Sequence, residues 1–259
     1  MAEPEILCER DGPLAIVTFN RPQQRNAMTW AMYEGLASAC ETVDGDPEVR
    51  VLILRGAGGK AFVAGTDIGQ FQEFRSPEDA LDYERRMDRV ITRLETVQKP
   101  TIAAIAGVAV GGGATIALAC DLRYCTPESR FGVPIARTLG NCLSMANYAR
   151  LVDLLGPARA KELIFRARLV PAEDALACGL VNEVVPAEQL DAHVREVARE
   201  IAGHAPITLR VTKESIRRLA LHRRAPESED LILQAYLSQD FREGIAAFLA
   251  KRPPTFRGV

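Results

Sequence analysis

The chain has 259 residues, of which 47% are hydrophobic and 25% are charged, and this composition excludes an intrinsically disordered protein. Its formal net charge of −2 gives no overall attraction to nucleic acid or to an anionic membrane, so neither is expected as a partner. The N-terminus has no signal-peptide pattern and no uncharged apolar run reaches about 18 residues, so we expect a cytoplasmic protein. The six cysteines are scattered, without a Cys-x-x-Cys or paired histidines, and the sequence predicts no metal site.

Alternating strand and helix patterns predict an α/β layered core. Short aliphatic and β-branched runs predict strands over residues 14–19, 49–54, 100–110 and 122–125. Apolar residues at helical spacing predict helices over residues 29–43, 77–96, 144–155, 158–165, 172–177, 187–202, 207–221 and 228–250. Thr29 is a possible N-cap of the first helix, and the last third of the chain is expected to be largely helical.

Two glycine-containing turns follow predicted strands, at Phe62–Ile68 and at Gly111–Gly113. Each can present backbone N–H groups, because glycine lets a ligand approach the main chain closely. The second turn also opens a helix, whose N-terminus favours negative charge. Together they predict a site for an oxygen that becomes negative during acyl or enolate chemistry. The alternative is that the glycines only permit close packing of helix on sheet. The chain has neither the P-loop nor the dinucleotide-binding glycine pattern.

The sequence resembles the crotonase superfamily, also called the enoyl-CoA hydratase/isomerase family. The segments that carry the resemblance occur in the family's order along nearly the whole chain, at Asn20–Ala27, Phe62–Ile68, Lys99–Gly107, Gly111–Gly113, Cys120–Asp121, Phe131–Pro134, Ala177–Val181 and Glu243–Arg252. The resemblance implies a spiral of β-β-α turns over residues 1–200 and a C-terminal helical trimerisation region over residues 201–259, as parts of one structural unit. It also implies a homotrimer, or a hexamer built from two trimers.

The resemblance further implies an acyl-CoA substrate, with no cofactor beyond its coenzyme A moiety. The thioester oxygen would lie between the backbone amides of Thr66 and Gly112 and become an enolate oxygen there without a metal. The remaining coenzyme A contacts implied by the family are Arg25, Ala64, Gly65, Asp67, Ile68, Phe248 and Lys251. The positively charged side chains of Arg25 and Lys251 would pair with the phosphate groups of coenzyme A. The alternative interpretation is that both are ordinary surface charges. For Asp67 the alternative is a structural role, bonding the amides of its own loop.

Hydratases of the family use two glutamates, one to activate water and one to deliver a proton. The matching positions here are Thr115 and Ile135, and a shifted register offers Ala136 or Arg137 instead of Ile135. No carboxylate results either way. The standard two-glutamate hydration is therefore not expected of this chain.

Other side chains of the same region are then the candidates for chemistry. Thr115 can hold water or a substrate hydroxyl, and Arg137 can pair with the carboxylate of a malonyl-type thioester. The further candidates are Asn141, Cys142, Ser144 and Tyr148. As a nucleophile Cys142 would need a neighbouring base, and its position does not place it beside His193, His204 or His222, so a buried structural thiol is favoured.

Three interpretations of function remain open at this stage. The leading one is an acyl-CoA enzyme with a backbone oxyanion hole, catalysing atypical hydration or dehydration, double-bond isomerisation or decarboxylation. The second is a catalytically silent acyl-CoA-binding subunit that retains the scaffold without the acids. The third, an α/β protein that does not bind coenzyme A, leaves the ordered set of motifs unexplained.

Overall fold

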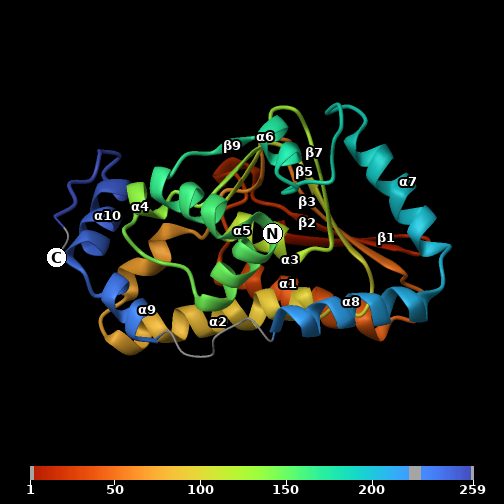
Figure 1. The fold of residues 1–259 in the computed structure, drawn as a ribbon, viewed down its shortest axis with the longest axis horizontal. Helices are drawn as coiled ribbons and strands as arrows, with labels where there is room; N and C mark the ends of the chain where they lie inside the picture. The colour runs from red at the N-terminus through yellow and green to blue at the C-terminus, as the bar shows by residue number, and fades with distance from the viewer. Residues whose placement is uncertain (1–2, 222–228, 258–259) are drawn as a thin grey trace.

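Two sheets covered by helices form the body of the molecule in the computed structural model, which describes residues 3–221 and 229–257 (Figure 1). Within this part, a six-stranded sheet has the order β1-β2-β3-β5-β7-β10 and a four-stranded sheet the order β4-β6-β8-β9. The strands are β1 (Ile6–Asp11), β2 (Leu14–Phe19), β3 (Val51–Gly56), β4 (Ala61–Val63), β5 (Thr101–Ile105), β6 (Val108–Val110), β7 (Leu122–Cys125), β8 (Arg130–Gly132), β9 (Val170–Pro171) and β10 (Glu183–Val184). The pairs β1/β2 and β8/β9 are antiparallel, and the other neighbouring strands are parallel.

The helices lie between and after these strands, and the expected α/β class with a largely helical last third is confirmed. They are η1 (Pro22–Gln24), α1 (Trp30–Gly45), η2 (Ile68–Glu73), α2 (Pro77–Glu95), α3 (Gly112–Ala119), α4 (Ile135–Thr138), α5 (Met145–Arg166), α6 (Ala172–Ala177), α7 (Leu190–Ala202), α8 (Pro206–Leu221), α9 (Glu229–Tyr236) and α10 (Gln239–Leu249).

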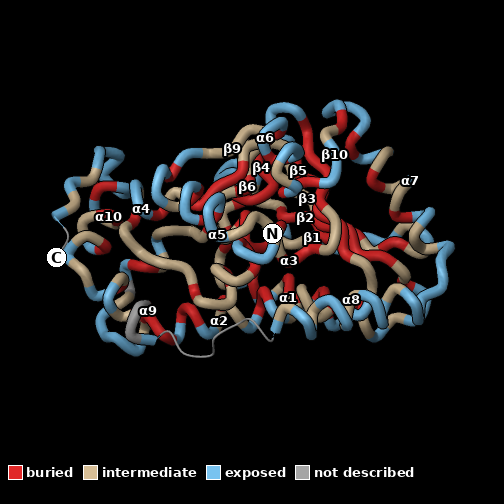
Figure 2. The backbone as a smooth tube through the Cα atoms, in the orientation of Figure 1, coloured by how far each residue is buried: buried red, intermediate tan, exposed pale blue. Residues whose placement is uncertain are grey.

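The central strands are apolar on both faces because helices cover both faces of the larger sheet. In β2, Leu14 and Ile16 pack into a cluster with α7, while Val17 and Phe19 point the other way, into the main core. Figure 2 shows the buried strands as a continuous inner layer. Unbroken aliphatic runs in the sequence therefore correspond to strands buried on two sides.

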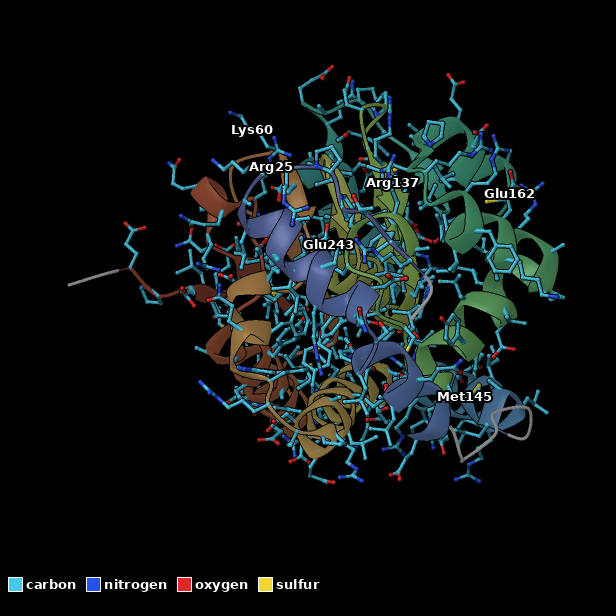
Figure 3. All side chains as sticks on the ribbon, turned by 90° about the vertical axis from the view of Figure 1, so that its left-hand side faces the viewer. Arg25, Lys60, Arg137, Met145, Glu162 and Glu243 are labelled. Atoms are coloured by element: carbon cyan, nitrogen blue, oxygen red, sulfur yellow. The ribbon has the colours of Figure 1, made fainter. Side chains whose placement is uncertain are left out.

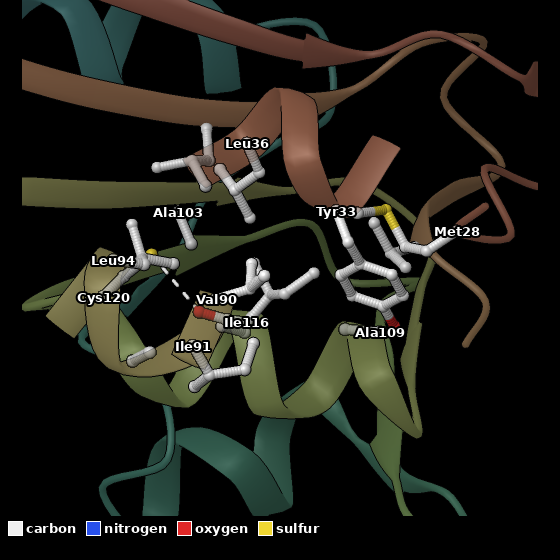
Figure 4. Packing of buried hydrophobic residues seen from close by; sticks show 14 of the residues in the cluster. Met28, Tyr33, Leu36, Val90, Ile91, Leu94, Ala103, Ala109, Ile116 and Cys120 are labelled. Atoms are coloured by element: carbon white, nitrogen blue, oxygen red, sulfur yellow. Dashed lines mark hydrogen bonds between the residues drawn. The ribbon is translucent and has the colours of Figure 1, made fainter. Parts of the chain in front are cut away.

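The main core lies between the larger sheet and helices α1, α2 and α3, as Figure 4 shows. Leu36 of α1, Ile91 of α2 and Ile116 of α3 are fully buried there. The Thr29 hydroxyl accepts a hydrogen bond from the amide of Met32, so the predicted N-cap of α1 is confirmed.

The single strand predicted over residues 100–110 is wrong, because β5 and β6 belong to different sheets. The chain turns at Gly107, whose φ is 74°, in the left-handed region that favours glycine. A methyl group at this position would also overlap the carbonyl of Lys60. The turn delivers Val108–Val110 to the smaller sheet and so places Gly111 at the carboxyl end of the inner strand β6.

Three predicted helices differ in extent from those observed. The helices expected over 144–155 and 158–165 are one element, α5, with a kink at Gly156, where φ is 73°. The helix expected over 228–250 is divided into α9 and α10, and its predicted start at Ser228 lies outside the described residues. The division matters for the site, because α9 packs on α2 while α10 packs on η2 and α4.

Candidate active site

A cleft of about 530 Å³ opens where the ends of β4 and β6 meet α2, α4 and α10. The turn after β4 and the start of α3 form one part of its wall. Helix α2 and the segment between α4 and α5 form another. Seven of the residues implied by the family resemblance line this cleft together with Gly112 and Thr115, namely Arg25, Ala64, Gly65, Thr66, Asp67, Ile68 and Phe248.

Gly112 lies next to the Thr66 amide in the cleft wall. A methyl group added to the Cα atom of Gly112 would lie 3.7 Å from the Thr66 nitrogen. The neighbouring amide of Asp67 donates to the Met28 carbonyl, and the Gly65 carbonyl accepts from the Met28 amide. Because successive amides of an extended segment point to opposite sides, the Thr66 N–H points away from Met28. Gly112 is the first residue of α3, where an amide has no partner inside the helix.

Two buried tyrosines fix the Thr66 side chain next to these amides. The hydroxyl of Tyr33 lies 2.9 Å from Thr66 Oγ1, and that of Tyr83 lies 3.1 Å from the same atom. Burial raises the pKa of both phenols, so they remain neutral hydroxyls. Thr66 is thus joined to α1 and α2, and the backbone that carries its amide is positioned by the core.

Thr115 and Ile135 stand at the two positions where the family resemblance would place glutamates. Thr115 lines the cleft, but its hydroxyl donates to the Gly112 carbonyl at 2.8 Å and is almost completely buried. Ile135 begins α4 and contributes an apolar side chain to the same cleft. Neither residue can take a proton from water.

A carboxyl group that the sequence analysis missed lies in this cleft. Glu84 of α2 is 5% exposed and lines the cavity. Its Oε1 accepts a hydrogen bond of 2.5 Å from the hydroxyl of Tyr236, at the end of α9. Desolvation by burial raises the pKa of Glu84 to about 8, so the group is mostly protonated at pH 7.

A sequence signal for Glu84 does exist. Ala80, Glu84, Met87, Ile91 and Leu94 follow one another at spacings of three and four residues, which is the apolar face of an amphipathic helix. A glutamate in the middle of that face has to be buried once the helix packs on the core. The helix over residues 77–96 was predicted, but residue 84 matches neither glutamate position of the family hydratases and so was not among the predicted site residues.

Asn141 extends the contact around Glu84 to the segment between α4 and α5. Its Nδ2 donates to the Tyr236 hydroxyl at 3.2 Å. Its Oδ1 is buried and has no hydrogen-bond partner in the described part of the chain. Asn141 therefore adds an amide side chain to the lining of the cleft that also contains Glu84.

The other candidates from this segment are occupied or protonated. Ser144 donates to Asp88 at 2.5 Å and caps α5. Cys142 lines the cleft, and burial raises the pKa of its thiol to about 12, which makes it a poor nucleophile. His193 contacts Glu183, and His222 lies outside the described residues. Burial also raises the pKa of Tyr148.

Two predicted cations do not line the cleft. Arg137 is exposed on α4, and Lys251 is exposed just after α10, with a φ of 53°. Figure 3 shows Arg25 and Arg137 on the side of the molecule where α10, marked by Glu243, lies in front. The carboxylate-pairing role expected for Arg137 thus has no support in the geometry. Among the lining residues that the structure describes, Arg25 is the one with a positive charge.

Asp67 belongs to the loop that carries the Thr66 amide. Its Oδ1 accepts from the Gly69 amide at 3.2 Å and its Oδ2 from Arg21 at 3.1 Å. The carboxylate therefore caps the N-terminus of η2 and accepts a hydrogen bond from an amide of its own loop, as in the structural alternative.

Comparisons with known proteins agree with this arrangement. The family model described as enoyl-CoA hydratase/isomerase matches residues 9–259. The chain is 36% identical over 254 residues to the short-chain-enoyl-CoA hydratase of Clostridium acetobutylicum, covering 95% of each. The chain therefore belongs to the enoyl-CoA hydratase/isomerase family.

Two solved structures are similar over almost their whole length. An enoyl-CoA hydratase/carnithine racemase from Magnetospirillum magneticum is 38% identical with a TM-score of 0.81, over 100% of this chain and 97% of that one. A methylmalonyl-CoA decarboxylase in complex with 2-nitronate-propionyl-CoA is 29% identical with a TM-score of 0.91, over 100% of both chains. The crotonase-like fold expected from the sequence is thereby confirmed. No helix in the described ranges is long and apolar enough to span a bilayer.

Proposed function

We propose that the protein is an acyl-CoA enzyme that binds the thioester oxygen at the amides of Thr66 and Gly112 and removes CO₂ from a 2-carboxyacyl-CoA. The observation that carries the proposal is the closeness of Gly112 to the Thr66 amide, in a cleft that has no carboxylate at positions 115 and 135. The site is suited to stabilising an enolate, and it lacks the pair of groups that adds water across the double bond of an enoyl thioester.

The charge that develops during decarboxylation fits these amides. When the bond to the carboxylate breaks, its electron pair passes into the thioester and the carbonyl oxygen becomes negative. Fixed N–H donors stabilise such an oxygen, and each is typically worth roughly 3–4 kcal/mol of activation free energy. The N-terminus of α3 adds a favourable dipole at Gly112. No strong base is needed for this step.

Hydration and isomerisation have less support. Hydration requires one group to activate water and another to deliver a proton, and the hydroxyl of Thr115 is committed to its own helix. Isomerisation begins with proton removal by a base, whereas Glu84 holds its proton at neutral pH. The amide side chain of Asn141 in the lining favours a polar acyl group over a plain alkyl chain. Similarity to a methylmalonyl-CoA decarboxylase along the full length of both chains agrees with this choice.

Coenzyme A would enter from the side of Arg25. The Arg25 carbonyl accepts from the Ala64 amide at 3.1 Å, which holds the Arg25 loop against the turn that carries Thr66. The guanidinium would pair with phosphate, and Phe248 of α10 would pack on the organic part of the ligand. Lys251 does not line this cleft, so its proposed contact would be to coenzyme A bound by a neighbouring subunit.

Mass spectrometry of the products tests the proposal. The purified protein would be incubated with methylmalonyl-CoA, crotonyl-CoA, a 3-enoyl-CoA and a saturated acyl-CoA. We expect loss of CO₂ from methylmalonyl-CoA and no gain of water by crotonyl-CoA. Efficient hydration of crotonyl-CoA would contradict the choice of reaction. Tight binding of every thioester without turnover would instead support the silent acyl-CoA-binding subunit.

A further inference from the structure

The hydrogen-bonded group of Glu84, Tyr236 and Asn141 comes from three separate parts of the chain. Glu84 is on α2, Tyr236 ends α9, and Asn141 lies between α4 and α5. The Tyr236 hydroxyl donates to Glu84 and accepts from Asn141. A carboxyl group held in this way has a defined orientation, although it lies at the wall of a cavity.

Helix α2 also ties Glu84 to the amides that would hold the thioester oxygen. Tyr83, the preceding residue, lies 3.1 Å from Thr66 Oγ1 and lines the same cleft. One turn of α2 therefore contacts both the Thr66 loop and the polar end of the cavity. A thioester whose oxygen is at Thr66 and Gly112 would occupy the same cleft as this turn of α2.

The electrostatic surroundings of Glu84 keep a proton on it. Burial is the main cause of its raised pKa, Asp88 adds repulsion, and hydrogen bonds from Tyr236 and the Ser144 amide act in the opposite direction. The titratable side chains that interact with it are Tyr33, Tyr83, Asp88, Cys142, Tyr148 and Tyr236. None of these is a cation, so the ionised carboxylate has no paired charge in the described residues.

We propose that Glu84 is a catalytic acid, which protonates the α-carbon of the thioester enolate. This inference rests on the proposed function. In the forward reaction the bond to the carboxylate breaks, CO₂ leaves, and the electron pair is held as the enolate. The Glu84 O–H bond then breaks while the new C–H bond forms, and the carboxylate regains its proton from water. Tyr236 is a positioning residue, because its hydroxyl orients the carboxyl group without contacting the substrate.

The reverse proton transfer provides a direct test that does not depend on CO₂ loss. Ionised Glu84 would remove a proton from the α-carbon of propionyl-CoA, so the protein would exchange that hydrogen for deuterium in D₂O. We expect the exchange rate to rise with pH and to level off above about pH 8, where the carboxyl group is ionised. Glu84→Gln keeps an acceptor for Tyr236 but has no ionisable proton. It should lower exchange by about 10²-fold or more, the usual contribution of a general acid or base.

A second measurement follows the stereochemistry of the product. Decarboxylation of methylmalonyl-CoA in D₂O creates a chiral carbon, and a fixed acid should deliver deuterium to one face. We expect one enantiomer from the wild type and a mixture from Glu84→Gln, in which water protonates the enolate. Glu78→Gln removes a glutamate from the exposed first turn of the same helix and should change neither result.

The two proposals fail in different ways. If the wild type neither decarboxylates methylmalonyl-CoA nor exchanges propionyl-CoA, the proposed function is wrong. If the wild type does both and Glu84→Gln retains the same exchange rate and one product enantiomer, the role of Glu84 is wrong.

Tyr236→Phe provides a variant that leaves the acid in place, in case Glu84→Gln does not fold. The Tyr236 hydrogen bond favours the ionised carboxylate, so its loss should move the midpoint of the exchange profile to higher pH. An unchanged midpoint would contradict the role assigned to Glu84 and Tyr236.

Discussion

Gly112 lies so close to α1 that a methyl group added to it would overlap the hydroxyl of Tyr33. Gly112→Ala should therefore displace the Gly112 amide and lower kcat about 10²–10³-fold, the effect of losing one oxyanion donor. Tyr33→Phe removes the overlapping oxygen, so the double variant should regain part of the lost rate. Steady-state kinetics of the single and double variants would check this. Gly45→Ala, where nothing lies within 4 Å of the added atom, is the control.

The buried carboxyl group of Glu84 should also affect stability. Its pKa of about 8 in the folded chain lies above the ordinary value of 4.5, so the folded state binds the proton more tightly than the unfolded state. The contribution of Glu84 to stability is present below pH 4.5 and is lost as the pH rises through about 8. Relative to Glu84→Gln, the wild type should lose up to about 1.4 kcal/mol of unfolding free energy per pH unit between these values. Urea denaturation of both proteins at several pH values measures this, and a constant difference would contradict it.

Among the α-helices in the described part of the chain, α8 differs from the others in having no buried residue. Lys213 ties it to the body, because its Nζ lies 2.7 Å from Asp121 Oδ2 and 3.2 Å from the Lys99 carbonyl. Lys213→Met should cost about 1.5–3 kcal/mol, the range for hydrogen bonds to charged groups, and should speed amide hydrogen exchange in α8. Arg218→Met is the matched control, because Arg218 pairs with Glu214 inside the same helix. Equal protection of α8 in the wild type and Lys213→Met would show that this tie contributes little.

The whole molecule presents large apolar side chains to solvent along α8. Ile207, Val211, Ile216 and Leu219 are each more than half exposed. Such side chains are expected to be covered in an assembly, and the family resemblance implies a homotrimer or hexamer for the protein. Multi-angle light scattering should give the mass of three or six chains. Ile216→Glu/Leu219→Glu should lower that mass without unfolding the chain, while Ile216→Leu/Leu219→Ile should not. A wild-type mass of one chain would contradict the expected assembly.

Much of this molecule follows from local patterns in the sequence. The strands near residues 14–19 and 49–54 and the helix capped by Thr29 are where the aliphatic runs and the helical spacing predict them. The run from 100 to 110 was wrongly assigned to one strand, since hydrophobicity does not tell which sheet a residue joins. Gly107 decides that through a left-handed turn against Lys60, a contact between segments far apart in the chain.

The sequence by itself determined the family, the two glycine-containing turns and the absence of carboxylates at positions 115 and 135, because these depend on residue type and order. Only the tertiary structure decided that Glu84 lines the cleft and that Arg137 and Lys251 do not. Glu84 belongs to a charged helix in the sequence, but α9 and the segment at Asn141 bury it in the folded chain. The pKa of a carboxyl group depends on the solvent it loses and on the charges near it, and the contacts that bury this one come from residues that are distant in sequence.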